Sequence, residues 1–234
     1  LAGVLILTGY FTIAQGQYQS GLDVVAKGGF SDLREKNIGV VVNHTSVDQH
    51  GNHLIQLAYD NGIQIKAVFT PEHGFTGVAG AGEKVEDGIE PLTGSSIYSL
   101  YGKNNKPSPQ MLQGLDVVVF DMQDIGVRYY TYISTLTYIL EAAAENEVPI
   151  WILDRINPLG REVDGLVLEE EFKSFVGMHP IPIRHGMTIG QLAQMINEEN
   201  WLSDGLKANL KVIQYEGKPN QADREKAFNP PPSP

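Results

Sequence analysis

The stretch FTPEHGFTGVAGAGEKV, residues 69–85, places the carboxylate of Glu72 beside the imidazole of His73, directly after an apolar run. A carboxyl group next to apolar side chains, here Phe69 and Phe75, can keep its proton and act as a general acid. The glycines that follow would let the backbone approach a bulky substrate or close over it. Taken singly, Glu72 can also be a turn cap and His73 a core histidine.

Polar side chains follow four apolar runs of the sequence, at the point where each run ends. They are Asn43, His44, Thr45 and Ser46; Glu72 and His73; Asp121, Gln123, Asp124 and Arg128; and Asp154, Arg155 and Asn157. The carboxyl ends of parallel strands meet at one edge of a sheet, where ligands bind, so this pattern indicates one shared site. The candidate catalytic groups are Glu72, His73, Asp121 and Asp124. The candidate binding groups at these ends are Asn43, Thr45, Arg128, Asp154, Arg155 and Asn157.

Each of these residues also has an ordinary structural interpretation. Asp121, Asp124 and Asp154 stand where aspartates commonly cap helices. The segment GVRYYTY, residues 126–132, is chiefly aromatic core or rim, since its three tyrosines cannot all face one cleft. Arg128 is harder to explain in this way, because a guanidinium in an apolar context needs an anionic partner.

The elements that position these groups alternate between strands and helices. Continuous apolar runs predict strands that are covered on both faces, at residues 38–42, 63–70, 95–102, 117–120 and 148–155, with a late strand within 209–217. Helical periodicity predicts helices within 51–62 and 131–147. This alternation predicts an α/β fold with a Rossmann-like, doubly wound, mostly parallel sheet.

A third helix is predicted to begin after Thr188, which forms a capping box with Gln191. Arg184 and His185 lie just before this helix. An anion-binding pair and a surface salt bridge explain these two residues equally well.

The chain divides into three parts on the basis of its composition. Residues 1–20 are apolar and end in small and polar residues, which is typical of an export signal clipped at its start, so we expect a periplasmic or secreted protein. The run is too short to span a bilayer. Residues 21–165 carry the Rossmann-like catalytic domain. The composition changes beyond residue 165, and residues 218–234 are an exposed linker or an element cut short.

Net charge and missing motifs exclude several classes of function. The formal charge of −11, from 28 acidic and 17 basic residues, repels nucleic acids and anionic membranes. Cysteine is absent, so a thiolate nucleophile is excluded. The dinucleotide-binding turn, the Walker motif and the G-x-S-x-G elbow are missing as well. A metal site of His44, His73, Asp121 and Asp124 lacks supporting spacing, which leaves carboxylate chemistry without a cofactor, such as the hydrolysis of a glycosidic bond.

Six motifs together resemble the exo-acting β-N-acetylmuramidases of the NamZ type, a bacterial family formerly known as a domain of unknown function. The motifs are TPEHGFTG, AGEKV, VVVFDMQDIGVRYYTYISTL, ILDRINPLG, VDGLVL and PIPIRHGMTIGQLA. They occur in the family's order, and the resemblance covers nearly everything from Gly21 to about Trp201. The resemblance implies release of N-acetylmuramic acid from the non-reducing end of peptidoglycan fragments, with muropeptides or disaccharides as partners. In the family the chain continues past the Pro-Ser-Pro segment into a smaller lid-like domain, so we expect a C-terminally truncated member. The resemblance thus implies that residues 166–234 hold the remainder of the core and the start of an incomplete lid-like domain.

The resemblance also implies roles for individual residues. The catalytic glutamate of the family's Pro-Glu-His-Gly motif falls on Glu72. Its partner is Asp121, Asp124 or Glu83, and His73 can assist. Binding of the lactyl carboxylate of the sugar requires a cation, which is either Arg128 or Arg184 with His185. Tyr129 or Tyr132 can stack on the sugar ring. The alternative function is a non-catalytic muropeptide or sugar binder on the same scaffold, and a metal-dependent hydrolase is a third interpretation.

Overall fold

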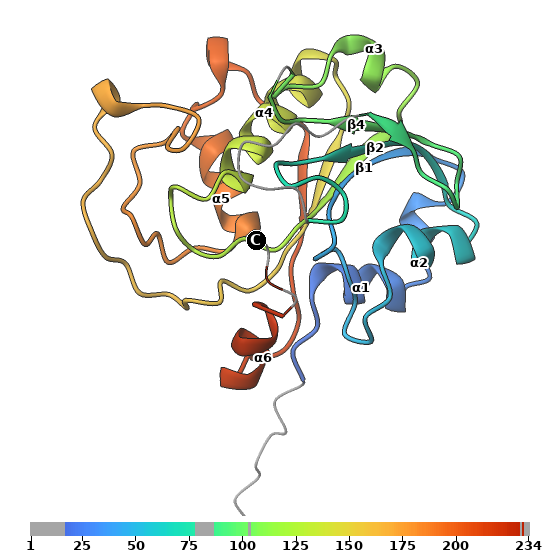
Figure 1. The fold of residues 1–234 in the computed structure, drawn as a ribbon, viewed down its shortest axis with the longest axis horizontal. Helices are drawn as coiled ribbons and strands as arrows, with labels where there is room; N and C mark the ends of the chain where they lie inside the picture. The colour runs from blue at the N-terminus through green and yellow to red at the C-terminus, as the bar shows by residue number, and fades with distance from the viewer. Residues whose placement is uncertain (1–16, 78–86, 103, 230, 232–234) are drawn as a thin grey trace, which may run out of the picture.

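A seven-stranded sheet forms the centre of the computed structural model, which describes residues 17–77, 87–102, 104–229 and 231 (Figure 1). The strand order is β3-β4-β2-β1-β5-β6-β7, and every pairing is parallel except β3 with β4. The strands are β1 Asn37–Val42, β2 Gln64–Thr70, β3 Gly88–Ile89, β4 Ser96–Ser99, β5 Val117–Asp121, β6 Ile150–Leu153 and β7 Leu210–Ile213. The predicted α/β fold with a mostly parallel sheet is confirmed.

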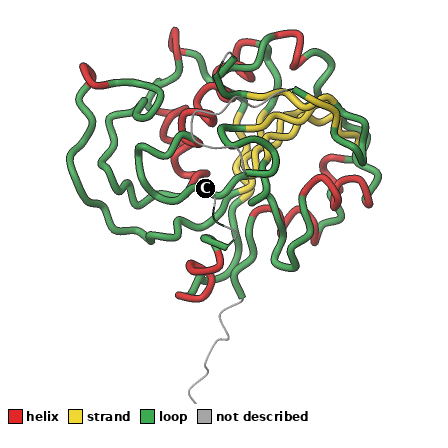
Figure 2. The backbone as a smooth tube through the Cα atoms, viewed as in Figure 1, coloured by secondary structure: helices red, strands yellow, loops and turns green. Residues whose placement is uncertain are grey.

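Helices cover both faces of this sheet, as Figures 1 and 2 show. They are α1 Gly21–Lys27, α2 Leu54–Asp60, α3 Pro109–Leu112, α4 Tyr132–Glu145, α5 Ile189–Glu198 and α6 Gln221–Lys226, with short 3₁₀ turns at Ser31–Leu33, Glu170–Phe172 and Ser203–Gly205. Alternate residues of a strand face opposite sides. Val41 therefore joins the core cluster that contains α4 and α5, whereas Val40 and Val42 join the cluster that contains α1 and α2.

The strongest sequence patterns match the observed elements. All five residues of β5 are buried, as its unbroken apolar run predicts. The capping box of Thr188 and Gln191 is present at the start of α5, and the apolar stripe of that helix is buried. The segment 218–234, predicted as a linker or a cut element, instead contains α6, which has a capping box of Asn220 and Asp223.

The N-terminal part of the described chain packs on the domain. Gln19 forms an isolated β-bridge with Glu216, and Ser20 caps α1 in a capping box with Asp23. The predicted leader otherwise lies outside the described residues. No helix of the described ranges is long and apolar enough to cross a membrane.

A long connection joins β6 to α5 and contains only one 3₁₀ turn, as the wide loop in Figure 2 shows. Several of its apolar side chains are exposed, namely Val163, Leu166, Val167, Phe172 and Val176. Its inner part is fixed to α4 by His179, whose ring stacks on Trp201 with 5.0 Å between ring centroids and whose Nε2 lies 2.8 Å from Thr137 Oγ1. Burial, with a smaller contribution from the charge of Lys173, lowers the pKa of His179 to about 4.

We predict that His179 makes stability depend on pH. The unfolded chain binds a proton at this residue near pH 6.5, whereas the folded chain binds it only at a pKa of about 4. The free energy of unfolding should therefore fall by about 3 kcal/mol as pH drops from about 6.5 to 4, and this loss is absent above that window.

Urea unfolding at pH 7 and pH 4.5 measures this effect. His179→Gln, which keeps an N–H donor for Thr137, should remove part of the pH dependence, whereas the same change at the exposed His50 should leave it intact. An equal pH dependence in wild type and His179→Gln would show that another group is responsible.

Candidate active site

The predicted site residues lie at one edge because the strand ends are in register. Val41 of β1 pairs with Phe69 of β2, and Val42 pairs with Asp121 of β5. Strands β2 and β4 lie on one side of β1 in the sheet, and strands β5, β6 and β7 lie on the other side. Ligands of open α/β sheets bind at such a switch point, outside the carboxyl ends of the strands.

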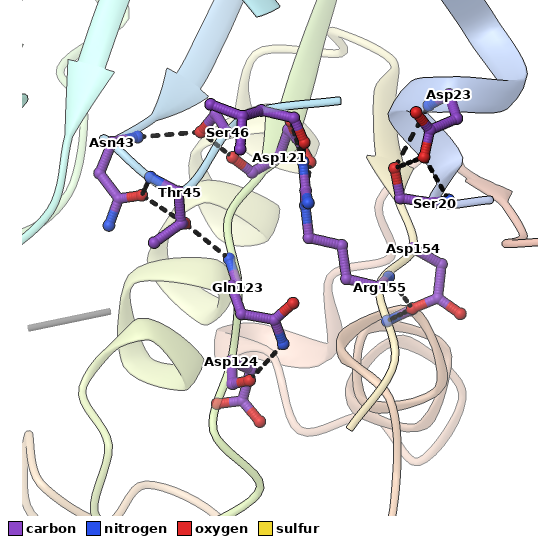
Figure 3. Close-up of polar contacts among 12 residues, drawn as sticks. Ser20, Asp23, Asn43, Thr45, Ser46, Asp121, Gln123, Asp124, Asp154 and Arg155 are labelled. Carbon is purple, nitrogen blue, oxygen red and sulfur yellow. Dashed lines mark hydrogen bonds and ion pairs between the residues drawn. The ribbon is translucent and has the colours of Figure 1, made fainter. Parts of the chain in front are cut away.

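A buried hydrogen-bond network joins the loops after β1 and β5 (Figure 3). Asn43 Oδ1 accepts from the backbone N–H and the hydroxyl of Thr45, at 2.9 and 2.6 Å, and Thr45 Oγ1 accepts from the N–H of Gln123 at 3.0 Å. Asn43 Nδ2 donates to the hydroxyl of Tyr132 at 2.7 Å, which connects the network to α4. Two candidate binding residues, Asn43 and Thr45, therefore hold the shape of this edge.

Asp121 and Arg155 form a buried, bidentate ion pair. Arg155 Nε lies 2.6 Å from Asp121 Oδ1, and Arg155 Nη2 lies 2.9 Å from Asp121 Oδ2. Burial alone would lower the pKa of Arg155, but the charge and hydrogen bonds of Asp121 outweigh burial and raise it. Arg155 Nη2 also donates to the carbonyl of Val47 at 3.0 Å. Both carboxylate oxygens of Asp121, a candidate catalytic group, are thus occupied by the guanidinium.

Asp154 binds the start of α5. Its carboxylate accepts from the hydroxyl of Thr188 at 2.9 Å and from the N–H of Gly190 at 2.8 Å. A Cβ on Gly190 would lie 2.7 Å from Asp154 Cγ, so only glycine permits this close approach. Burial raises the pKa of Asp154, and these hydrogen bonds oppose the rise. Asp154 therefore binds the start of a helix whose N-cap residue, Thr188, lies 34 residues later.

Asn157 fastens the segment before α5 as well. Its Nδ2 donates to the carbonyl of Met187 at 2.9 Å, and its Oδ1 accepts from the N–H of Leu159 at 2.9 Å. Both the nitrogen and the oxygen of the Asn157 amide therefore hold the local backbone in place.

Asp124 and His185 lie against each other in the interior, with 3.3 Å between Asp124 Oδ2 and His185 Nε2. Asp124 Oδ2 also accepts from the N–H of Gly126 at 2.8 Å. His185 Nδ1 accepts from the N–H of Met187 at 3.2 Å, which leaves the other ring nitrogen, Nε2, next to the carboxylate. Both side chains are at most 4% exposed. The sequence predicted them separately, and the structure brings them together.

The two candidate cations contact the long connection between β6 and α5. Arg128 Nη1 donates to the carbonyls of Leu166 and Ile181, at 2.7 and 2.6 Å, and so bridges the two sides of that connection. Arg184 lies 2.9 Å from Glu162 and donates to the carbonyl of Leu159.

The two tyrosines that were expected to stack on a sugar differ in exposure. Tyr129 is 59% exposed, so its ring can offer a face to a ligand. Tyr132 is 1% exposed and its hydroxyl is bound by Asn43, so its ring belongs to the core.

Glu72 follows β2 and is partly exposed at the edge of the sheet. Its Oε2 accepts a hydrogen bond from the hydroxyl of Thr131 at 3.0 Å. Burial, followed by contacts with Tyr130 and the charge of Glu72, raises the pKa of Tyr132. Glu83, another candidate partner, lies outside the described residues.

His73 is buried and adopts the left-handed backbone conformation, with φ of 70°. This conformation is uncommon for a residue with a side chain and costs about 1 kcal/mol. Gly74 continues the turn with φ of 73°. The strained turn bends the chain away from β2 immediately after Glu72, as is frequent at functional sites.

Comparison with known proteins identifies the family of the chain. The model of the family described as exo-β-N-acetylmuramidase NamZ, N-terminal, matches residues 38–234. The chain belongs to the NamZ N-terminal family. The chain is 44% identical over 204 residues to the peptidoglycan β-N-acetylmuramidase NamZ of Bacillus subtilis, a match that covers 86% of this chain and 48% of the relative.

Two solved structures from Bacteroides fragilis, both described as DUF1343 family proteins, have the same fold as this NamZ-family chain. One has a TM-score of 0.81 and covers 90% of this chain and 53% of its own; the other has a TM-score of 0.75 and covers 86% and 52%. Both are 38% identical to the chain. The chain thus spans about half the length of the relatives that it matches.

Two residues of this NamZ-family site were not anticipated from the sequence. One is Thr131, the partner of Glu72. The other is His53, whose Nδ1 accepts from the N–H of Ile55 to cap α2 and whose Nε2 lies 2.9 Å from the carbonyl of Asn43. Burial lowers the pKa of His53. In both cases the available signal was a polar residue within the first three positions of a predicted helical segment.

A groove and a pocket flank the edge of the sheet. The groove is lined by His44, His53, Phe75, Thr76, Glu90 and Leu92. The pocket lies under α6 and is lined by residues that include Tyr18, Asp23, Thr45, Arg155 and Lys226. Within the described ranges, no three His, Cys, Asp or Glu side chains are grouped so as to hold a metal ion.

We predict that Asp121→Asn destabilises the chain by about 3–5 kcal/mol, because it leaves the guanidinium of Arg155 buried without its countercharge. Chemical denaturation measures the loss. Glu216→Gln, which removes the exposed ion pair with Lys27, is the matched control and should cost less than about 1 kcal/mol. Similar small losses in both variants would show that the buried pair does not stabilise this edge.

Proposed function

We propose that the chain carries the catalytic carboxylate of an exo-acting glycosidase that releases N-acetylmuramic acid from the non-reducing end of peptidoglycan fragments. Glu72 is the proposed carboxylate. Membership of the NamZ family and the name of the Bacillus subtilis relative support the substrate class. The substrates are muropeptides or disaccharides derived from peptidoglycan.

The observation that carries the assignment of Glu72 is the contrast among the strand-end acids. Asp121 is paired with Arg155, Asp124 faces His185, and Asp154 binds the start of α5. These three aspartates are at most 4% exposed. Glu72 is partly exposed, so it is the acid best placed to meet a substrate.

The proposed reaction uses Glu72 as an acid. Its carboxyl proton passes to the glycosidic oxygen as the bond from that oxygen to C1 breaks, and a water molecule adds to C1 and loses its proton to a second group. Asp124 and Glu83 remain candidates for that second group, and His73 can assist it. Asp121 is a poor candidate because Arg155 occupies both its oxygens.

Recognition of the lactyl carboxylate is assigned to a cation near the edge of the sheet. Arg128 and Arg184 each contact backbone carbonyls of the connection between β6 and α5. A guanidinium has five N–H donors, so these contacts leave room for a bidentate carboxylate. The exposed ring of Tyr129 is the proposed stacking surface.

The proposed site of action is the periplasm or the cell exterior. The support is the apolar, signal-like segment at residues 1–20 together with the location of peptidoglycan outside the cytoplasmic membrane.

We predict that Glu72→Gln lowers kcat on a chromogenic N-acetylmuramide by about 10²–10⁴-fold, because the amide cannot donate the acidic proton. Release of the free sugar is the measurement, and circular dichroism checks the fold. Glu198→Gln, at an exposed position of α5, is the matched control and should keep full activity. Unchanged turnover in Glu72→Gln would contradict the assignment. Wild-type binding of the muramide without turnover would instead indicate the sugar-binding alternative.

A further inference from the structure

The start of α4 differs from the starts of four other described helices and resembles that of the four-residue α3, where Ser108 makes no capping bond either. In four of the described helices the residue before the first turn accepts a hydrogen bond from a backbone N–H of its own helix, namely Ser20, His53, Thr188 and Asn220. Helix α4 has 14 residues and begins after Thr131, whose side chain makes no such bond. Threonine is a favoured capping residue, so this unused hydroxyl calls for a reason.

The backbone of Thr131 explains why its hydroxyl is available. The four capping residues are extended, and Thr188, for example, has φ of −79° and ψ of 166°. Thr131 is already helical, with φ of −66° and ψ of −9°, so its hydroxyl does not return to the first turn. The hydroxyl instead donates to Glu72 Oε2 at 3.0 Å, across 59 residues of sequence.

Thr131 is held in place from both sides. Its carbonyl accepts the first α-helical hydrogen bond of α4, from the N–H of Thr135 at 2.9 Å. The next residue, Tyr132, is anchored by Asn43 at 2.7 Å, which ties the start of α4 to the end of β1. A donor that is fixed in this way can fix the orientation of the carboxylate that it binds.

We propose that Thr131 is a positioning residue for Glu72: it gives up its capping role to hold one carboxylate oxygen at the edge of the sheet. The inference rests on the proposed function, in which Glu72 is the catalytic carboxylate. A neutral hydroxyl suits an acid that must gain and lose a proton, because a carboxyl oxygen accepts its hydrogen bond in either protonation state.

Three variants test this proposal. Thr131→Val removes the hydroxyl and keeps the shape of the side chain, whereas Thr131→Ser keeps the hydroxyl. Thr188→Val is the matched control, since it removes a hydroxyl that does cap its helix. The measurements on the 234-residue chain are kcat and KM on the chromogenic muramide, the thermal midpoint, and the carboxyl ¹³C resonance of Glu72, which is identified by its loss in Glu72→Gln.

Thr131→Val should lower kcat by about 10-fold or more with KM nearly unchanged. It should also shift the carboxyl resonance of Glu72 and change the thermal midpoint by less than about 1 °C. Thr131→Ser should restore both kcat and the resonance. Thr188→Val should lower the midpoint by about 2–4 °C and leave the Glu72 resonance in place.

A Thr131→Val chain with an unmoved Glu72 resonance, or with normal kcat, would overturn the proposal. A drop in its thermal midpoint equal to that of Thr188→Val would do the same, since it would show an ordinary structural role. A wild-type chain without turnover would overturn the proposed function, and the Glu72 resonance would then still decide whether Thr131 orients this carboxylate.

Discussion

The guanidinium of Arg155 connects the loops that follow three strands of the sheet. It pairs with Asp121 at the end of β5, donates to the carbonyl of Val47 beyond β1, and itself follows β6. Because the pair is buried, removing either charge would leave the other without compensation. The geometry of the whole edge, including the place where Glu72 emerges from β2, therefore depends on this interaction.

The polar residues of the edge divide into those that build it and those that can react. Asn43, Thr45 and Gln123 are joined by hydrogen bonds, and the carboxylate of Asp154 accepts a hydrogen bond from the start of α5. Such a network has little freedom to rearrange when a substrate arrives, which favours a preorganised site. Glu72 lies beside this rigid framework and is contacted by a hydroxyl at the start of α4.

The sequence predicts the sheet well because burial on both faces leaves an unbroken apolar run, as in β5. It fails for α1 and α6, which have only 7 and 6 residues, because fewer than two full turns give little length over which a helical period can show. Parallel strands predict that the site residues share an edge, but not their pairing. Asp121 and Arg155 are 34 residues apart, and only the packing of β5 beside β6 decides that they neutralise each other.

The order of the strands has a consequence for how the chain acquires its structure. Strand β1 is central and is synthesised early, yet it pairs on one side with β5, and their starts are linked by a contact between residues 79 positions apart. Closing so long a loop is slow, and until it closes one edge of β1 is left without its partner. The newly made chain thus passes through a stage in which an apolar strand edge is prone to aggregation.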